Sequence, residues 1–569
     1  MPDERTVNSV LAELFHNEGI HTSFMYLSED MMNLAARIDD YDASTIIQSR
    51  HEQDAVTMAD GYARHTKDIG LAVVGQGGAI GQTGSSLVTA RKRGSNLLVV
   101  APEATRTLSV DNPTTYNDPT PGIAAKDFDQ TGYLRDTIEQ VRSVRTPEVL
   151  VPIFKEVIRK IRLGNGPMAV TISTDVLNGD MELGGEMRSA LESPTELHTD
   201  PDAVLAPGAK RIDQAVESFL DSDATKHPMV VVGRGAARET YRPDIERLAE
   251  RMGAVLGTSF RGKGFFPDHP YYVGTVGETG EPLAIEYASE ADYVLVLGAS
   301  LNARTWDAGR LFDEDATIVH ADIDDAALGR YGPIDLGIHG DAGSVAGRLA
   351  DALADAGIDR SAEMWTDNLE ARIAEHDPYE HVEFTDRDDA LDPRRVVAEF
   401  DGILPRDRVV VVDGGHMARW VYQRVDVHSP DHLICRGDFS SIGLGLPMSI
   451  GASVGTDADT TPVLFCGDGG LLMHFQELSS AARFDIPLII VCFNDDALAA
   501  EYHRMAPEDQ FIARTEAPNL ADAAAGLGCD AYRVRTPEEL ADIATHVDHK
   551  PDGPVVIECV VDRDVQTAM

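Results

Sequence analysis

The fold is decided by the stretch Val463-Leu464-Phe465-Cys466-Gly467-Asp468-Gly469-Gly470 and by Asn494-Asp495-Asp496, which follows a second apolar run at residues 486–493. Residues 474–484, between the two, carry apolar side chains at helical spacing. The whole segment is therefore predicted to form a strand, a glycine turn, a helix and a second strand. In a doubly wound sheet, both polar turns would emerge at the carboxyl edge, where ligands bind.

The two turns carry oxygen ligands and small residues. Asp468 and Asp495 suit a hard divalent cation such as Mg²⁺, which is held by one or two carboxylates together with phosphate oxygens. Within the turn Gly467-Asp468-Gly469-Gly470, the glycines allow backbone N–H groups to approach phosphate. Either turn alone is more often an ordinary loop. Their pairing across one strand-helix-strand unit predicts a diphosphate and magnesium site.

Together the two turns resemble the diphosphate and metal motif of thiamine diphosphate-dependent enzymes. Many members of that family have Asn-Asn where this chain has Asn494-Asp495. Aspartate is an equally good ligand for a hard cation, so the difference removes no ligand. The resemblance implies that thiamine diphosphate and Mg²⁺ bind here, with Asp468, Asp495 and the backbone carbonyl of Ala497 as the metal ligands. Gly467, Gly469 and Gly470 would contact the cofactor.

A distant segment resembles the Arg-His-Glu-x-x-Ala…Gly-Tyr-Ala sequence of acetolactate synthase. Residues 45–49 are strand-like, and the predicted helix that follows opens with Arg50-His51-Glu52. The resemblance implies that Glu52 hydrogen-bonds the aminopyrimidine ring and favours the imino tautomer, whose nitrogen takes the thiazolium proton. The alternative is a helix N-terminal glutamate that stabilises the helix dipole. His51 is a second catalytic candidate, for a polar pocket, or else a solvated loop residue.

Two further segments are candidates for cofactor binding. Residues 440–452 resemble the family stretch that ends in Leu-Pro-x-x-Ile-Gly-Ala, which implies that Ser441 and Ile442 contact the cofactor. Ile442 would hold the two cofactor rings in a V shape, or would be an ordinary core isoleucine. The strand-like residues 408–412 end in Asp413-Gly414-Gly415-His416, a further diphosphate loop. His416 is either a proton donor or cofactor contact, or a satisfied loop histidine.

Alternating strands and helices throughout the chain predict an α/β protein with three doubly wound parallel-sheet domains. The resemblance implies a pyrimidine-binding domain at residues 1–185, a central domain at 205–350 and a diphosphate-binding domain at 390–569. Three domains suit a chain of 569 residues. In the family, the pyrimidine half and the diphosphate half of one site come from different subunits. A homo-oligomer, at least a dimer, is therefore expected.

The chain is strongly acidic. It has 49 Lys and Arg against 95 Asp and Glu, a formal net charge of 49 − 95 = −46. Binding to nucleic acid or to an anionic membrane surface is therefore not expected. Scarce lysine and abundant aspartate resemble cytoplasmic proteins of salt-loving organisms, although an ordinary acidic protein remains the alternative. No basic-then-apolar leader and no run of 18 apolar residues is present, so a cytoplasmic location is predicted.

The resemblance implies acetolactate synthase-like decarboxylation of a 2-oxo acid, with or without joining of the product to a second carbonyl compound. The alternatives are a simple decarboxylase resembling benzoylformate decarboxylase, and a non-catalytic cofactor-binding protein. Residues 24–28 and 75–84 differ from the substrate loops of relatives, so the donor acid is not named. Residues 298–305 also depart from the acetolactate synthase version, and no tightly bound FAD is predicted.

Overall fold

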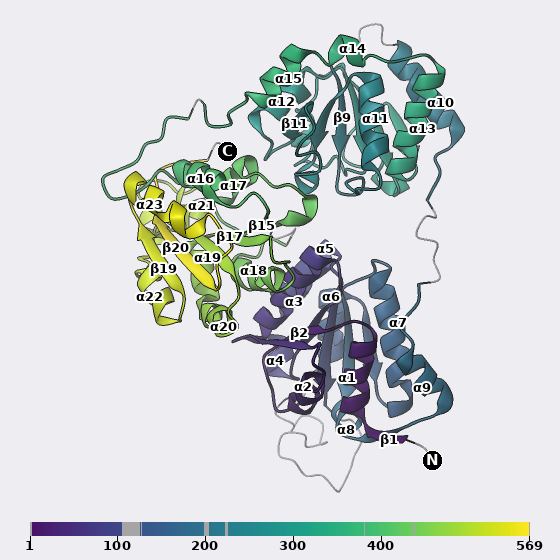
Figure 1. The fold of residues 1–569 in the computed structure, drawn as a ribbon, viewed down its shortest axis with the longest axis vertical. Helices are drawn as coiled ribbons and strands as arrows, with labels where there is room; N and C mark the ends of the chain where they lie inside the picture. The colour runs from purple at the N-terminus through teal and green to yellow at the C-terminus, as the bar shows by residue number, and fades with distance from the viewer. Residues whose placement is uncertain are drawn as a thin grey trace.

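The computed structural model describes residues 3–104, 126, 128–197, 204–221, 226–380, 382–435 and 439–567. These residues form three units, each built on a six-stranded sheet whose neighbouring strands are all parallel (Figure 1). The predicted α/β class with three doubly wound domains is confirmed. The exact domain boundaries at residues 185, 205, 350 and 390 stay predictions.

The N-terminal unit has the strand order β3-β2-β4-β5-β7-β6. Its long helix α7 shows why helices cover this sheet, because its buried residues Leu150, Phe154, Val157 and Ile161 recur at helical spacing. A short antiparallel pair, β1 with β8, lies beside the sheet. The strands are β1 (Asp3–Thr6), β2 (Thr22–Met25), β3 (Thr45–Gln48), β4 (Gly70–Val73), β5 (Leu97–Glu103), β6 (Val141–Val144), β7 (Met168–Ser173) and β8 (Asp180–Leu183). The helices are α1 (Val7–Asn17), α2 (Met32–Asp39), α3 (Glu52–Thr66), α4 (Gly78–Gly81), α5 (Gly84–Arg93), α6 (Gln130–Ile138), α7 (Leu150–Arg162), α8 (Thr174–Leu177) and α9 (Gly185–Glu192).

The central unit has the strand order β11-β10-β9-β12-β13-β14. Strands β9 and β12 are buried along their whole length, as continuous apolar runs in a parallel sheet covered on both faces should be. The strands are β9 (Pro228–Val232), β10 (Val255–Thr258), β11 (Tyr272–Thr275), β12 (Tyr293–Leu297), β13 (Thr317–Asp322) and β14 (Leu336–His339). The helices are α10 (Ala209–Asp221), α11 (Arg242–Met252), α12 (Pro282–Glu290), α13 (Ala342–Asp355), α14 (Ser361–Met364) and α15 (Asp367–Ala374).

The C-terminal unit has the strand order β16-β15-β17-β18-β20-β19. The helix predicted at residues 474–484 forms as the 3₁₀ turn η6 (Phe475–Glu477) followed directly by α20, and His474 (φ −132°, ψ 27°) separates it from α19. The strands are β15 (Arg408–Val412), β16 (Leu433–Cys435), β17 (Thr461–Gly467), β18 (Leu488–Asn494), β19 (Asp530–Val534) and β20 (Pro554–Val560). The helices are α16 (Pro393–Ile403), α17 (Ala418–Arg424), α18 (Gly445–Val454), α19 (Asp468–Met473), α20 (Leu478–Arg483), α21 (Ala499–Tyr502), α22 (Leu520–Gly526) and α23 (Pro537–Val547).

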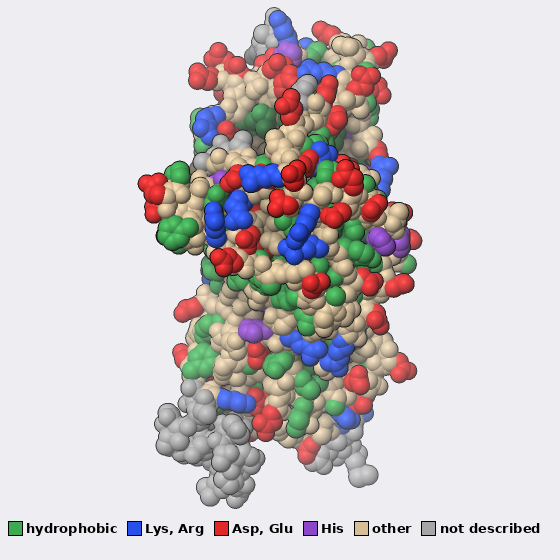
Figure 2. Space-filling model, turned by 90° about the vertical axis from the view of Figure 1, so that its left-hand side faces the viewer, with side chains coloured by type: hydrophobic (Ala, Val, Ile, Leu, Met, Phe, Trp, Pro, Cys, Tyr) green, Lys and Arg blue, Asp and Glu red, His purple; other side chains and the backbone are tan. Residues whose placement is uncertain are grey.

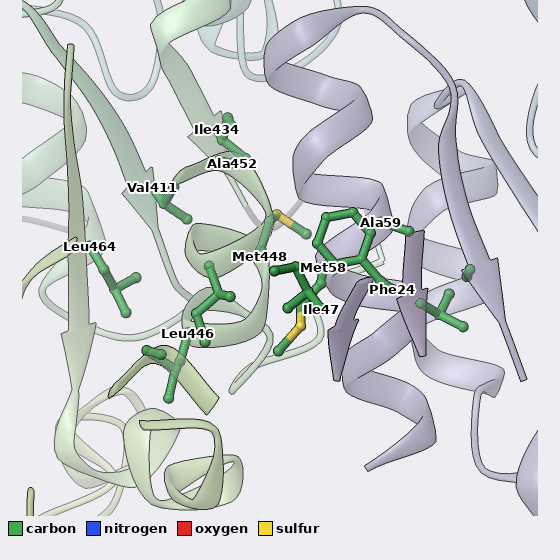
Figure 3. Close-up of a cluster of buried hydrophobic side chains, with 14 of the residues drawn as sticks. Phe24, Ile47, Met58, Ala59, Val411, Ile434, Leu446, Met448, Ala452 and Leu464 are labelled. Atoms are coloured by element: carbon green, nitrogen blue, oxygen red, sulfur yellow. The ribbon is translucent and has the colours of Figure 1, made fainter. Parts of the chain in front are cut away.

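Helices α3 and α18 join the N-terminal unit to the C-terminal unit. Figure 3 shows Met58 of α3 facing Met448 of α18 within one apolar cluster, to which strands of both sheets contribute side chains. The backbones touch, because a Cβ built on Gly61 would lie 2.1 Å from the carbonyl oxygen of Met448, and one on Gly451 would lie 1.8 Å from that of Met58. Only glycine permits so close an approach. The two units therefore share a core within one chain.

Acidic side chains dominate the surface. Figure 2 shows Asp and Glu spread over the whole of one face, with Lys and Arg gathered mainly across its middle. This distribution matches a charge carried along the entire chain rather than in one tail. Within the described residues, no helix combines the length and the apolar character that crossing a membrane requires.

Candidate active site

A cavity of about 510 Å³ lies at the carboxyl ends of β15, β17 and β18. Its opposite wall comes from the central unit, through Phe260, Glu278, Thr279 and Arg304. The site predicted from strand ends is therefore a real hollow between two units. Ten of the predicted site residues line it: Gly414, Gly415, His416, Ile442, Gly467, Asp468, Gly469, Gly470, Asp495 and Ala497.

Two carboxyl groups, those of the buried Asp468 and the half-buried Asp495, line this cavity. Burial raises the pKa of Asp468 to about 6. Burial and then the charge of Asp468 raise the pKa of Asp495 to about 8. The Thr515 hydroxyl donates to Asp468 over 3.2 Å, and the Ala497 N–H donates to Asp495 over 3.0 Å. Two like charges held this way repel each other, and a divalent cation between them would remove that repulsion.

Asp413 organises the loop that ends β15. Its Oδ1 accepts a hydrogen bond from the N–H of Gly414 (2.7 Å), and its Oδ2 accepts one from the N–H of Gly443 (2.9 Å). A Cβ built on Gly470 would lie 2.7 Å from the same Oδ2. The buried Asp413 carboxylate thus contacts three glycine-containing turns around the cavity. The sequence placed Asp413 in a candidate diphosphate loop at the end of an apolar run, but gave it no separate role.

Ile442 and Ser441 point to different places. Ile442 lines the cavity and remains 38% exposed, so it is not an ordinary core isoleucine. Ser441 does not line the cavity; its hydroxyl lies 2.6 Å from that of Ser85 on α5. Ser440, one residue earlier, lines the cavity instead. A cofactor role for Ser441 therefore has no geometric support within this chain.

Glu52 and His51 lie outside the cavity. Glu52 begins α3 and its Oε2 accepts a 3.5 Å hydrogen bond from Gln82. His51 is the N-cap of the same helix, and its Nδ1 accepts a hydrogen bond from the N–H of Gln53 (3.1 Å). Among the described residues of the N-terminal unit, none lines the cavity. One chain therefore does not bring the two predicted halves of the site together.

His416 sits at the cavity wall as a neutral imidazole. Burial, and then the neighbouring His503, lowers the pKa of His416 to about 4. The Thr567 N–H donates to its Nε2 over 3.2 Å, so the other ring nitrogen carries the proton. Sequence reasoning missed His503 and the wall residues Arg304, Arg419 and Arg504, all of which line the cavity. No local motif marks them, because distant loops bring them there.

Comparisons with known proteins cover most of the chain. Residues 5–121 match the thiamine pyrophosphate enzyme N-terminal TPP binding domain, residues 213–349 match the central domain, and residues 413–559 match the C-terminal TPP binding domain. The chain belongs to the thiamine pyrophosphate enzyme family. Thiamine pyrophosphate is thiamine diphosphate, so the resemblance noted from the motifs is confirmed.

Relatives in the family have several activities. A probable acetolactate synthase large subunit of Methanocaldococcus jannaschii is 26% identical, over 92% of this chain and 87% of the relative. A sulfoacetaldehyde acetyltransferase of Rhodobacter capsulatus is 25% identical, over 98% of this chain and 95% of the relative. The solved thiamine diphosphate-dependent 4-hydroxybenzoylformate decarboxylase of Rhodococcus jostii shares the fold, with a TM-score of 0.75, 20% identity, and coverage of 98% and 99%. Membership of an enzyme family is thereby established, and the reaction is not fixed by it.

Replacement of Asp495 tests whether its side chain acts as a metal ligand or merely fills space. Asp495→Ala should weaken Mg²⁺-dependent binding of thiamine diphosphate by at least ~100-fold, because it removes one of the two predicted charged ligands. Asp495→Asn keeps an oxygen ligand and should stay within ~10-fold of the natural protein. Titration calorimetry with the cofactor at fixed Mg²⁺ measures both. Equal losses in the two variants would show that the metal does not sit on Asp495.

Proposed function

We propose that the protein uses thiamine diphosphate and Mg²⁺ to decarboxylate a 2-oxo acid and to pass the resulting acyl unit to a second carbonyl compound, as acetolactate synthase does. The observation that carries the proposal is that Asp468 and Asp495 follow two adjacent strands and line one cavity of about 510 Å³ beside glycine turns. That donor set fits a metal-bound diphosphate.

When bound, thiamine diphosphate supplies a carbanion that attacks a carbonyl and stores the electrons released when the neighbouring bond breaks. The residues of the protein would hold and orient the metal, the cofactor and the substrate. Asp468, Asp495 and the carbonyl of Ala497 would bind the metal. Gly414, Gly469 and Gly470 would leave room for phosphate oxygens, while Ile442 would support the rings from the cavity floor. His416, neutral at physiological pH, would offer its ring N–H to a substrate oxygen.

We infer a homodimer with shared sites. Glu52 lies outside the cavity of its own chain, so Glu52 of the partner subunit would complete that cavity. Exposed apolar side chains in both units support the inference that a second subunit covers part of their surface. They are Tyr26, Leu27 and Met32 in the N-terminal unit, and Leu472, Met473, Phe511 and Ile512 in the C-terminal unit. Exposed apolar side chains that form one patch are typical of interaction surfaces.

Three arginines support the proposal that the substrate is an anion. Arg304, Arg419 and Arg504 line the cavity, and within the described residues none of them pairs with a carboxylate. The Arg419 guanidinium donates to the backbone carbonyl of Glu278, over 3.1 Å. Unpaired guanidinium groups bind carboxylates well, often with two hydrogen bonds. We propose that they orient the carboxylate of the 2-oxo acid.

The experiment that tests this function is carbon dioxide release from a panel of 2-oxo acids. The protein is assayed with Mg²⁺ and thiamine diphosphate, with and without an added aldehyde or 2-oxo acid as acceptor. Release that depends on both cofactors, together with a joined product, would support the proposal. Release with only an aldehyde as product would favour the simple decarboxylase. No release from any acid would contradict decarboxylation and leave the non-catalytic alternative.

Two sequence predictions accompany this proposal. The central unit is predicted to hold no FAD tightly, so the purified protein should be colourless, and a yellow protein with flavin absorbance would contradict that prediction.

The acidic composition predicts that activity rises toward molar potassium chloride, because concentrated cations screen the repulsion within a chain of charge −46. Full activity in dilute buffer would favour an ordinary acidic protein.

A further inference from the structure

Three ionisable side chains meet where the N-terminal and C-terminal units join. Asp54 lies on α3, His474 ends α19, and Glu477 lies on η6. Asp54 and Glu477 are fully buried at 0% exposure, and His474 is 6% exposed. The Nδ1 atom of His474 lies 2.6 Å from Oδ1 of Asp54. None of the three lines the cavity, so the cluster is separate from the proposed metal site.

The two carboxyl groups have too few donors to be both ionised. Glu477 Oε1 accepts a hydrogen bond from the N–H of Arg50 (2.6 Å), and Asp54 Oδ2 accepts one from the side chain of Gln476 (3.1 Å). Within the described residues, Glu477 Oε2 and Asp54 Oδ1 have no hydrogen-bond donor of good geometry. The side chains of Asp54 and Glu477 are themselves within hydrogen-bonding reach. A proton on Glu477 would satisfy both orphaned oxygens.

The surroundings favour that proton. Burial, and then the hydrogen bond and charge of Asp54, raises the pKa of Glu477 to about 9. The nearby arginines do not oppose this, because the Arg50 guanidinium donates to Ser479 and the Arg483 guanidinium donates to Gln48. The remaining ionisable groups nearby are His474 and His51, whose rings lie 6.4 Å apart. Helix α18, which packs against η6, has no ionisable side chain.

The cluster connects the two functional halves of the chain. Asp54 lies two positions after Glu52 on the same helix, and Glu477 follows the turn and helix that begin at Asp468. The backbone N–H that Glu477 accepts belongs to Arg50, directly before His51 and Glu52. We propose that Asp54 and Glu477 share one proton and act as positioning residues, fixing the start of α3 against the diphosphate-binding segment. This role rests on the proposed function.

The proposal predicts a pH dependence of stability that needs no cofactor. In the unfolded chain, glutamate ionises with a pKa of about 4.3. The folded chain keeps the proton until about pH 9, so between these values it binds one proton more than the unfolded chain. Stability contributed by Glu477 is therefore full below about pH 4.3 and is lost as pH rises toward 9.

The test compares Glu477→Gln, Glu477→Ala and Glu363→Gln, the last an exposed glutamate on α14 that serves as matched control. Urea unfolding of the cofactor-free protein is followed from pH 5 to pH 9. Glutamine mimics the protonated acid, so Glu477→Gln should fold stably. The free energy of unfolding of this variant should depend less steeply on pH, by the contribution of one proton. Glu363→Gln should keep the slope of the natural protein.

Turnover distinguishes positioning from simple packing. At neutral pH, Glu477→Gln should retain kcat, whereas Glu477→Ala should lose about 100-fold, because a small misplacement of Glu52 costs that much. An unchanged pH slope in Glu477→Gln, or equal loss of kcat in both variants, would overturn the proposal. If the natural protein turns over no 2-oxo acid, the proposed function fails, and the unfolding series alone still decides whether the proton is shared.

Discussion

Glu52→Gln should lower kcat by about 100-fold or more, because glutamine cannot exchange a proton with the aminopyrimidine ring. Binding of thiamine diphosphate with Mg²⁺ should change little, since Asp468 and Asp495 belong to a different unit of the chain. Steady-state kinetics on the accepted 2-oxo acid, together with titration calorimetry, measures the two effects separately. A Glu52→Gln variant with normal turnover would remove the activating glutamate from the mechanism.

The same variant tests whether the site is shared between subunits. Glu52→Gln and Asp495→Ala are each expected to be inactive. When the two are unfolded together and refolded, a mixed dimer contains one site with a natural Glu52 and a natural Asp495. Random pairing should then recover roughly a quarter of the natural activity. A site contained within one chain would recover none, which would contradict the proposed dimer.

Gly451→Ala should break the joint between the N-terminal and C-terminal units. The added Cβ would lie 1.8 Å from the carbonyl oxygen of Met58, a backbone atom that no side-chain rotation can move. Gly61 makes the reciprocal contact with Met448, so neither α3 nor α18 can give way locally. Overpacking usually costs about 1–3 kcal/mol, and a backbone clash in a shared core should reach or exceed the upper end. Urea unfolding followed by circular dichroism measures the loss.

Gly402→Ala is the matched control. Gly402 lies within α16 and has no heavy atom within 4 Å of an added Cβ. Alanine there should raise the free energy of unfolding by about 0.5–1 kcal/mol, because glycine is unfavourable inside a helix. Similar destabilisation in both variants would mean that helix chemistry, and not the contact with Met58, explains the effect.

Parts of the site could be read from the sequence because they are local. Asp468, Asp495 and the glycine turns each follow an apolar run, and a buried parallel strand places its end at the edge of the sheet. Gly414, Gly415 and His416 were found in the same way. The alternation of strand and helix likewise predicted three doubly wound units. These inferences need only the neighbours of each residue along the chain.

Other features depend on how distant elements pack. Arg304 reaches the cavity from another unit, and Ser441 turns to Ser85. No periodicity along the chain reports these contacts, because they arise from the packing of elements that are distant in the sequence. The sequence by itself located the strand ends and predicted a diphosphate site there, while the identity of the cofactor came from the resemblance of these motifs to a known family. Only the tertiary structure decided that Glu52 lies apart from its own cavity, and that Asp54 and Glu477 are buried side by side, because both facts follow from the packing of two separate units.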